Sequence, residues 1–330
     1  MSELATDSTV DAARRSELEE RLETHRRELA GYCYRMLGST FETDDAVQDT
    51  MLRAWRALDR FDGRSSLRTW LYRIATNVCL DMLSGRNRRA LPMDLGPSSP
   101  PVIASLGQPH PEAVWIQPIA DGTVLAADGD PADVAVGRES IRLAFVAALQ
   151  HLPPRQRAVL ILREVLRWSA IEVAELLEST VASVNSALQR ARATLAAVDA
   201  GTEDDFEPMD EAQKNLLARY VSAFTAYDIT AMVALLREDA TASMPPFQLW
   251  LQGRDDIGRW HLGPGHTCRG SVLVPVQANG SPAFAHYRPG PNGHAPFAIQ
   301  VLELTGDRIS RITYFLDTDL FPKFGLPQHP

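Results

Sequence analysis

The chain of 330 residues is 45% hydrophobic and 23% charged, a composition typical of a globular protein with two or three domains. A formal net charge of −9 excludes indiscriminate coating of nucleic acid, so any such contact has to be made by a local basic patch. The three cysteines lie far apart and form no CxxC pair, so the sequence predicts neither a disulfide framework nor a metal site. Because no long apolar stretch occurs, we expect a cytoplasmic protein that makes no membrane contact.

The first 90 residues predict a flexible arm followed by an all-helical domain. Residues 1–24 are charged and lack a firm apolar stripe, which favours a flexible N-terminal arm or a frayed helix. Within residues 25–90 the apolar spacing predicts a helix over Arg26–Leu37 and a turn over Gly38–Thr43. A second helix is expected to be capped by Thr43 or Asp44 and to end near Leu58. A loop over Phe61–Ser66 then leads into a third helix.

That third helix lies in Ser65–Arg89, the most informative segment of the chain. Its apolar residues recur at the i, i+3, i+4 and i+7 spacing of a packed helix: Leu67, Trp70, Leu71, Ile74, Ala75, Val78 and Met82. The segment also holds five arginines and one aspartate, a net charge of +4 in an acidic protein. A positive, hydrogen-bonding face on a packed helix is a candidate nucleic-acid surface.

Residues 91–137 change character and predict an acidic linker. They contain eight prolines and six acidic residues, and no lysine or arginine lies between Arg89 and Arg138. One apolar cluster, Val114–Ile119, interrupts the segment. We expect Trp115 in this cluster either to dock onto a folded domain or to make a stray apolar contact.

Residues 138–197 predict a second helical domain with a helix-turn-helix. The expected helices are Ile141–Leu149, Pro153–Leu166, Ala170–Leu177 with Ser169 as its cap, and Val181–Leu195. The internal seam is expected to consist of Val173, Ala174, Leu177, Val181, Val184 and Leu188. The outer face of the last helix carries side chains suited to base edges and phosphates: Ser183, Asn185, Ser186, Gln189, Arg190 and Arg192. The alternative is an ordinary helical hairpin with a solvated face.

The remainder of the chain predicts a second acidic linker, residues 198–209, and an α+β domain, residues 210–330. The expected helices are Glu211–Tyr227 and Ile229–Leu236. The expected strands are Thr241–Trp250, Ser271–Val276, Ala283–Arg288, Pro296–Leu304 and Arg308–Leu316, the last four as a meander.

The helix over Asp44–Leu58 has an acidic face edged by apolar side chains. Asp44, Asp45, Gln48 and Asp49 crowd its first turns, and Leu52 and Trp55 continue the stripe. Acidic residues near a helix N-terminus are favourable to the helix dipole on their own. The same face would also complement a basic helical partner.

Together these segments resemble the extracytoplasmic-function (ECF) group of bacterial RNA polymerase sigma factors. DDAVQDTMLRAWRAL and FDGRSSLRTWLYRIATNVCLDML resemble conserved region 2, and the Leu152–Leu160 run with the helix-turn-helix resembles region 4. Tyr314–Pro327, YFLDTDLFPKFGLP, resembles the fused SnoaL/NTF2-like domain of the SigG-like subset. The resemblance implies a multidomain protein: two all-α modules, region 2 and the region 4 helix-turn-helix, followed by an α+β SnoaL/NTF2-like cone.

The resemblance also implies a role for each set of residues. The β′ clamp of core RNA polymerase would contact Asp45, Gln48, Asp49, Leu52 and Trp55, with the β flap as a second contact. The separated −10 strand and its phosphates would contact Asp62, Arg64, Arg73, Asn77, Asp81, Arg86, Arg88 and Arg89. The −35 duplex would face Ser183, Asn185, Ser186, Gln189, Arg190 and Arg192. The acidic linker would thread the polymerase cleft, and Trp115 would be a regulatory docking residue.

Two departures from the family pattern bear on promoter recognition. Glu178 stands at the turn of the helix-turn-helix, where many members carry glycine. Asn185 stands at a frequently basic position, and position 187 is Ala. A less basic recognition helix predicts weak affinity for free DNA.

The expected function is promoter recognition by a polymerase subunit that performs no covalent chemistry and needs no cofactor. The C-terminal domain is expected to modulate this in cis, and a small-molecule ligand or an anti-sigma protein would be a further partner. Candidate residues inside the cone are Trp250, Trp260, His261, His286 and Tyr314. Two alternatives are a stand-alone helix-turn-helix regulator with a ligand domain and a SnoaL-type enzyme with helical appendages.

Overall fold

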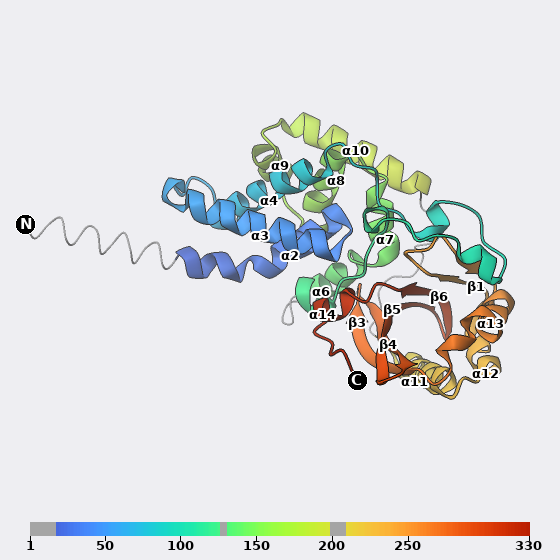
Figure 1. The fold of residues 1–330 in the computed structure, drawn as a ribbon. Helices are drawn as coiled ribbons and strands as arrows, with labels where there is room; N and C mark the ends of the chain where they lie inside the picture. The colour runs from blue at the N-terminus through green and yellow to red at the C-terminus, as the bar shows by residue number, and fades with distance from the viewer. Residues whose placement is uncertain (1–17, 126–130, 199–208) are drawn as a thin grey trace, which may run out of the picture. The chain divides into compact units, whose positions relative to one another are not determined.

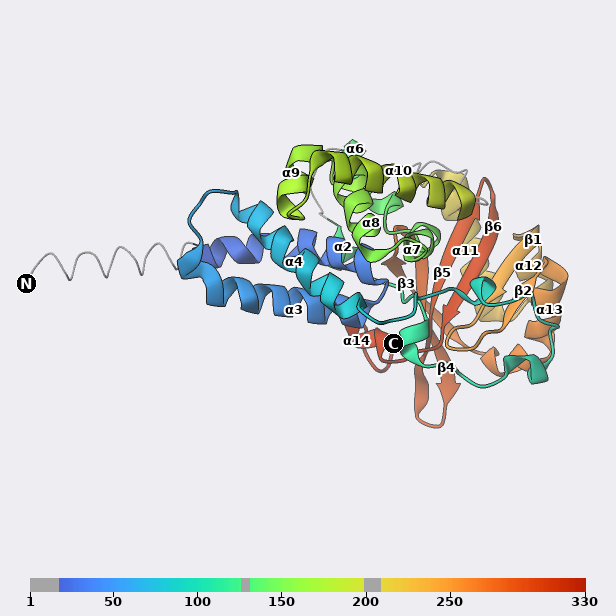
Figure 2. The ribbon, with the colours of Figure 1, turned by 90° about the horizontal axis from the view of Figure 1, so that it is seen from above.

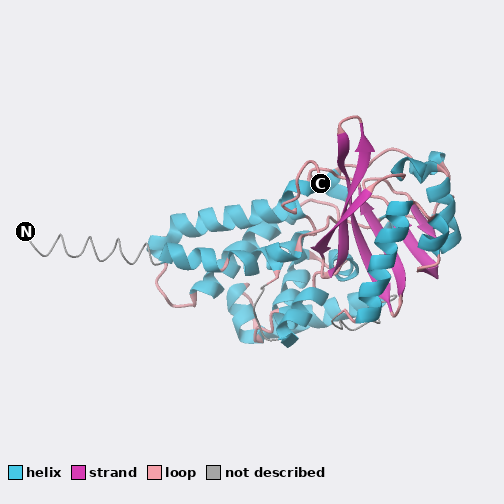
Figure 3. Ribbon diagram, turned by 90° about the horizontal axis from the view of Figure 1, so that it is seen from below, coloured by secondary structure: helices cyan, strands magenta, loops and turns pink. Residues whose placement is uncertain are grey.

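The computed structural model describes residues 18–125, 131–198 and 209–330. The chain divides into two compact units. Of the described residues, the first comprises 18–86, 123–125 and 148–198, and the second comprises 87–122, 131–147 and 209–330. All strands of the described residues belong to the second unit, and they are drawn in magenta in Figure 3. Residues 1–17 of the expected arm and 199–208 of the second acidic linker lie outside the described residues.

After the helical residues 18–24, the N-terminal part of the first unit contains α2 (Arg26–Leu37), α3 (Thr40–Ala57) and α4 (Leu67–Leu83) (Figure 2). The predicted turn over Gly38–Thr43 is wrong, because Ser39 caps α3 by accepting a hydrogen bond from the Glu42 amide at 3.2 Å. Residues 18–24 are helical and Leu22 is buried, so this part of the expected arm is folded.

The helix-turn-helix completes the first unit. Its helices are α8 (Pro154–Leu160), α9 (Ala170–Leu176) and α10 (Val181–Val198), and a π-helical turn, η5 (Ile161–Val165), follows α8. The predicted cap is confirmed, since Ser169 and Glu172 form a reciprocal capping box. The expected seam residues are buried except Val181, which is 40% exposed because it lies in the first turn of α10, beyond the contact with α9.

A six-stranded sheet forms the centre of the second unit (Figure 1). Its strands are β1 (Leu236–Ser243), β2 (Trp250–Gln252), β3 (Val272–Ala278), β4 (Ser281–Gly290), β5 (Gly293–Thr305) and β6 (Arg308–Phe315). The order is β2-β1-β6-β5-β4-β3, so the predicted four-strand meander is confirmed, and β1 joins it by parallel pairing with β6. The α+β arrangement expected of an NTF2-like domain is thereby confirmed.

Three helices pack with this sheet in one core: α11 (Glu211–Ala226), α12 (Ile229–Val233) and α13 (Arg254–Leu262). The short helix α14 (Leu320–Lys323) lies near the end of the domain. Tyr220, Phe224 and Trp260 pack with sheet residues in one apolar core. Two predictions fail at the start of the sheet. The helix from Ile229 ends at Val233, and the expected strand Thr241–Trp250 breaks because Pro245 and Pro246 interrupt it between β1 and β2.

The segment expected to be a linker contains short helical turns, and its residues 91–122 are part of the second unit. The turns are η2 (Pro92–Asp94), η3 (Ile103–Leu106) and η4 (Glu112–Val114), followed by α5 (Asp121–Val124). Helix α6 (Pro131–Glu139) begins inside the segment expected to be linker, and α7 (Leu143–Gln150) follows it. Over the described ranges, no helix has both the length and the apolar character needed to cross a membrane.

Candidate nucleic-acid interface

The outward face of α4 presents three polar side chains one helical turn apart. Arg73 is half-buried, Asn77 is exposed, and the Asp81 side chain is 71% exposed. Leu67, Leu71 and further apolar residues of α4 are buried in the helical bundle, and this fixes which face remains outside. The structure therefore places these three predicted residues together on one surface.

Two of the predicted arginines, and Arg53 of α3, are paired with carboxylates. Arg64 lies 3.0 Å from Asp62, Arg53 lies 3.5 Å from Asp81, and Arg86 is paired with Glu42. Exposed pairs of this kind contribute about 0–1 kcal/mol to stability. Phosphate groups can therefore replace these carboxylates with little loss of stability. Arg88 is also exposed.

Arg89 is held differently from the other arginines. It is 5% exposed, and its Nη1 donates to the carbonyl oxygens of Glu112 at 2.9 Å and Trp115 at 2.6 Å. The same nitrogen lies 3.1 Å from the Glu112 carboxylate. Arg89 cannot contact a phosphate in this arrangement unless the linker segment that carries Glu112 and Trp115 moves.

Region 2 and the helix-turn-helix pack against each other within the first unit. Trp168, just ahead of α9, lies with its ring 5.1 Å from that of Tyr72, and the Arg68 guanidinium lies 5.1 and 5.3 Å from these two rings. The Arg73 guanidinium donates to the carbonyl of Glu175 in α9 at 3.2 Å. One predicted −10 residue is thus bound by the first helix of the helix-turn-helix.

Arg157 is a second buried connection between these parts, and no sequence pattern predicted it. It is 3% exposed and donates to the Met36 carbonyl at the end of α2 and to Gln150 Oε1 at 2.8 Å. Burial lowers the pKa of Arg157 to about 10, so the side chain stays charged at neutral pH. Trp168 was likewise missed, although an apolar residue directly before a capping box is a known packing signal.

The recognition helix α10 presents its predicted residues to solvent. All six are exposed: Ser183, Asn185, Ser186, Gln189, Arg190 and Arg192. Val184, Leu188 and Ala191 are buried on the opposite side. Arg192 lies 2.5 Å from Glu164, while the turn before α10 holds Glu178 at a φ of +49°. The family's usual glycine thus corresponds to a left-handed backbone conformation here.

The solvent face of α3 carries the apolar side chains expected at a partner surface. Leu52 is 44% and Trp55 is 49% exposed, and Asp45 and Gln48 precede them on the same face. Trp55 Nε1 donates to Glu19 at 2.9 Å, and Asp49 pairs with Arg53 at 2.8 Å. Exposed large apolar residues aligned along one helix are typical of a protein interface.

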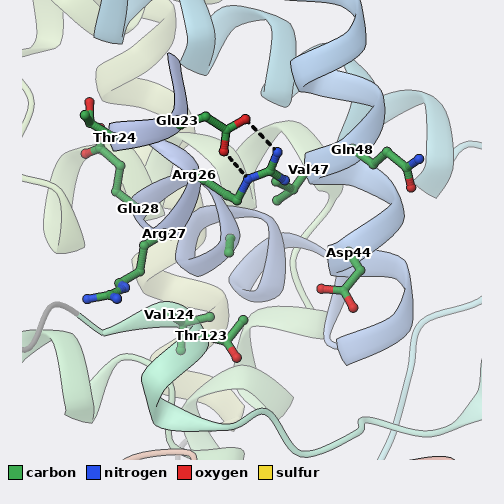
Figure 4. A pocket seen from close by; sticks show the side chains of 11 residues that line it. Glu23, Thr24, Arg26, Arg27, Glu28, Asp44, Val47, Gln48, Thr123 and Val124 are labelled. Carbon is green, nitrogen blue, oxygen red and sulfur yellow. Dashed lines mark hydrogen bonds and ion pairs between the residues drawn. The ribbon is translucent and has the colours of Figure 1, made fainter. Parts of the chain in front are cut away.

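A groove of about 960 Å³ lies beside this face, between α2 and α3 (Figure 4). Glu23, Arg26 and Glu28 line it from the α2 side, and Asp44 and Gln48 line it from α3. Thr123 and Val124 from α5 close one side. Val124 packs against Gly31, where a Cβ would lie 3.1 Å from the Val124 carbonyl oxygen. Helix α5 therefore approaches α2 closely.

Trp115 is 3% exposed, and Ile116 and Ile119 beside it are fully buried. The backbone of Trp115 pairs with Ala90 in a parallel bridge, and the Ile119 amide donates to Asn279 of the C-terminal domain at 3.0 Å. The apolar cluster of the linker is therefore bound, rather than solvated.

Three of the five cone candidates join a buried polar network. The Tyr314 hydroxyl lies 3.4 Å from His261 Nε2, and His286 Nδ1 lies 3.0 Å from Gln300, which also accepts from Tyr220 at 2.8 Å. Burial lowers the pKa of His261 to about 4 and that of His286 to about 3, so both rings are neutral. The other two candidates differ: Trp260 is buried in the apolar core, and Trp250 donates to the Gly96 carbonyl at 2.9 Å.

Comparison with known proteins agrees with this arrangement. The family described as Sigma-70 region 2 matches residues 22–89, and Sigma-70, region 4 matches residues 142–195. The chain is 46% identical to the ECF RNA polymerase sigma factor SigG of Mycobacterium tuberculosis, over 99% of this chain and 89% of that protein. It is 31% identical to SigW of Bacillus subtilis over 49% of this chain and 78% of that protein.

Among solved structures, the M. tuberculosis extracytoplasmic function sigma factor SigJ has a similar fold. The match has a TM-score of 0.60 at 22% identity and covers 94% of this chain and 99% of that chain.

Proposed function

The chain belongs to the extracytoplasmic-function family of RNA polymerase sigma factors, proteins that bind core RNA polymerase and promoter DNA, and we propose that its α4 and α10 faces contact the −10 and −35 elements. The observation that carries the proposal is the exposed polar face of α10, whose six predicted residues all point away from a packed seam. A recognition helix in the major groove requires this division.

The −10 element is proposed to contact the α4 face and the loop before it. Asn77 is exposed and carries an amide, which can donate to and accept from the edge of an unpaired base. Arg73 and the exposed arginines around it supply charge for the phosphates of a separated strand. These contacts form only when polymerase has melted the promoter, so the isolated chain is expected to bind DNA weakly.

The Asn77→Ala variant tests the −10 assignment. We expect loss of promoter melting with unchanged affinity for core polymerase, measured by permanganate footprinting and by titration with labelled core enzyme. The exposed Asn292 lies in the turn between β4 and β5, so Asn292→Ala is a matched control that should melt the promoter normally. An equal loss of core affinity in Asn77→Ala would show that the residue is structural.

The α3 face is proposed as the polymerase-binding surface. Leu52 and Trp55 offer exposed apolar area, and Asp45 and Asp49 add negative charge for a basic partner helix. The proposed action is binding without covalent chemistry, in the cytoplasm where the polymerase works.

The C-terminal domain is proposed to restrain the chain through its linker. Buried Arg89 is the observation that supports this, because the linker occupies a side chain expected to meet phosphate. Removal of residues 205–330 is expected to raise the affinity for core polymerase. Equal affinity and equal transcription from both forms would contradict this part of the proposal.

A further inference from the structure

The turn between β3 and β4 is buried, although it is the tip of a hairpin. Asn279 and Gly280 form this two-residue turn with φ values of +56° and +64°. Asn-Gly is a favoured pair for this geometry, so the sequence explains the turn locally. It does not explain why Asn279 is 0% exposed, whereas Asn292 in the next turn of the same sheet is exposed.

The linker buries the turn through paired hydrogen bonds. The Asn279 amide donates to the Ile119 carbonyl at 3.1 Å, and the Ile119 amide donates to Asn279 Oδ1 at 3.0 Å. The Gly280 amide donates to the Asp121 carboxylate at 2.8 Å. Ala120 and Ala278 also form an antiparallel bridge, so the linker extends the edge of the sheet at this point.

The same asparagine also holds the segment that leads into region 4. Asn279 Nδ2 donates to the Ile141 carbonyl at 2.7 Å, between α6 and α7. Gly280 faces this segment so closely that a Cβ would lie 2.6 Å from the Arg138 carbonyl. One side-chain amide therefore uses its oxygen for the linker and its nitrogen for the segment before region 4.

From this geometry we infer that the β3–β4 turn is a binding site for the chain's own linker, which competes with core polymerase for residues 115–121. The inference rests on the proposed function and on the expectation that the acidic linker threads the polymerase cleft. A backbone that is paired with Asn279 and Gly280 cannot lie in a second binding site at the same time. Docking of the linker on the turn and binding of polymerase are therefore negatively coupled, and each should weaken the other by the same factor.

Two variants weaken the contacts of the linker with the turn and are designed to leave the fold of the domain intact. Asn279→Gly keeps the left-handed conformation and removes both side-chain hydrogen bonds. Gly280→Ala introduces the clash with Arg138. Its matched control is Gly306→Ala in the β5–β6 turn, because Gly306 has a similar φ of +57° but a Cβ there meets nothing within 4 Å. Both alanines thus carry the same backbone strain.

Hydrogen exchange of the full-length protein measures the docking directly. Asn279→Gly and Gly280→Ala are expected to speed exchange in residues 115–121 by roughly tenfold or more relative to Gly306→Ala. Exchange in β5 and β6 reports folding of the domain and should stay unchanged. If Gly280→Ala also loses protection there, Asn279→Gly alone decides the outcome.

Titration with core polymerase then measures the competition. The two turn variants should bind core enzyme more tightly than wild type, and Gly306→Ala should match wild type. Faster exchange with unchanged or weaker polymerase affinity would overturn the competition, and unchanged exchange would overturn the docking site. Failure of the sigma-factor assignment is distinguishable, because then the wild-type chain itself would not bind core enzyme.

Discussion

The guanidinium of Arg73 on α4 donates a hydrogen bond to the backbone carbonyl of Glu175 on α9, at 3.2 Å. The first residue is expected to read the −10 element, and the second belongs to the helix-turn-helix expected at −35. A DNA phosphate that contacts Arg73 has to compete with this carbonyl for the guanidinium. The first unit is therefore in a form, here called closed, in which region 2 and the helix-turn-helix contact each other at a residue predicted to meet promoter DNA.

Opening of this contact on polymerase binding is the first prediction. Fluorescent labels at Ser84→Cys, after α4, and Ala193→Cys, on α10, lie at exposed positions, whereas the native cysteines are buried. We expect energy transfer between the labels to fall when core polymerase is added. A label pair at positions 60 and 84, both in region 2, should show no change.

Trp168 sets the strength of this contact. Trp168→Ala should open the contact between region 2 and the helix-turn-helix without polymerase. Truncation of a buried tryptophan to alanine typically lowers stability by about 3–5 kcal/mol. Trp168→Phe keeps a ring against Tyr72 and should stay closed. Energy transfer that is constant across wild type, both variants and added polymerase would show that the closed contact does not open.

The left-handed backbone at Glu178 leads to a second prediction. Its φ of +49° is unfavourable for a residue with a Cβ, by roughly 1 kcal/mol, and glycine relieves this at some cost in unfolded-chain entropy. Glu178→Gly is expected to stabilise the helix-turn-helix by about 0.5–1 kcal/mol in urea unfolding.

The matched control makes the same chemical change three residues earlier. Glu175 is exposed in α9, where glycine should destabilise by about 1 kcal/mol. If both substitutions destabilised the chain equally, backbone conformation would not be the cause.

Local signals made much of this structure predictable. The capping box at Ser169 and Glu172 is set by residues three apart, and the strands of the meander by short alternating runs and turns. The start of α3 was misplaced because Ser39, Thr43 and Asp44 are all plausible caps, and only packing selects Ser39.

The contacts that restrain the candidate sites are long-range and carry no local signal. Arg89 looks like a surface arginine in sequence, and its burial depends on a linker carbonyl 26 residues away. Asn279 predicts a tight turn, but the linker that covers it lies 160 residues earlier. Periodicity reports which face of an element is buried and does not report which distant segment buries it.

The neutral histidines of the C-terminal domain predict a pH dependence of stability. Burial lowers the pKa of His286 to about 3, with further lowering by His261 and Arg288, and burial lowers the pKa of His261 to about 4. Their pKa in the unfolded chain is about 6.5, so below that pH the unfolded state binds more protons. Stability is therefore full above about pH 6.5 and falls between there and pH 4, by up to about 1.4 kcal/mol per pH unit for each histidine.

Glutamine at position 286 isolates this contribution, because it can still accept a hydrogen bond from Gln300. We expect His286→Gln to reduce the loss of stability between pH 7 and pH 5, measured by hydrogen exchange in β5 and β6. His329→Gln at an exposed position should leave the loss unchanged. A wild-type slope in His286→Gln would mean that this histidine is protonated in the folded domain.

The last prediction concerns which residues of α10 contact bases and which contact phosphates. Asn185 lies in the second turn of the helix and carries no charge, whereas Arg190 lies further along the same exposed face. A neutral amide can discriminate base edges, and an arginine without a fixed partner base contributes mainly charge.

Transcription by the holoenzyme on a series of promoters tests this difference. Asn185→Ala should relax the sequence preference at one −35 position, by about 1–3 kcal/mol. Arg190→Ala should weaken all promoters alike and lower the salt dependence by about one ion. Equal losses on every sequence for both variants would contradict base reading by Asn185, and a sequence-selective loss for Arg190→Ala would assign the reading to the arginine instead.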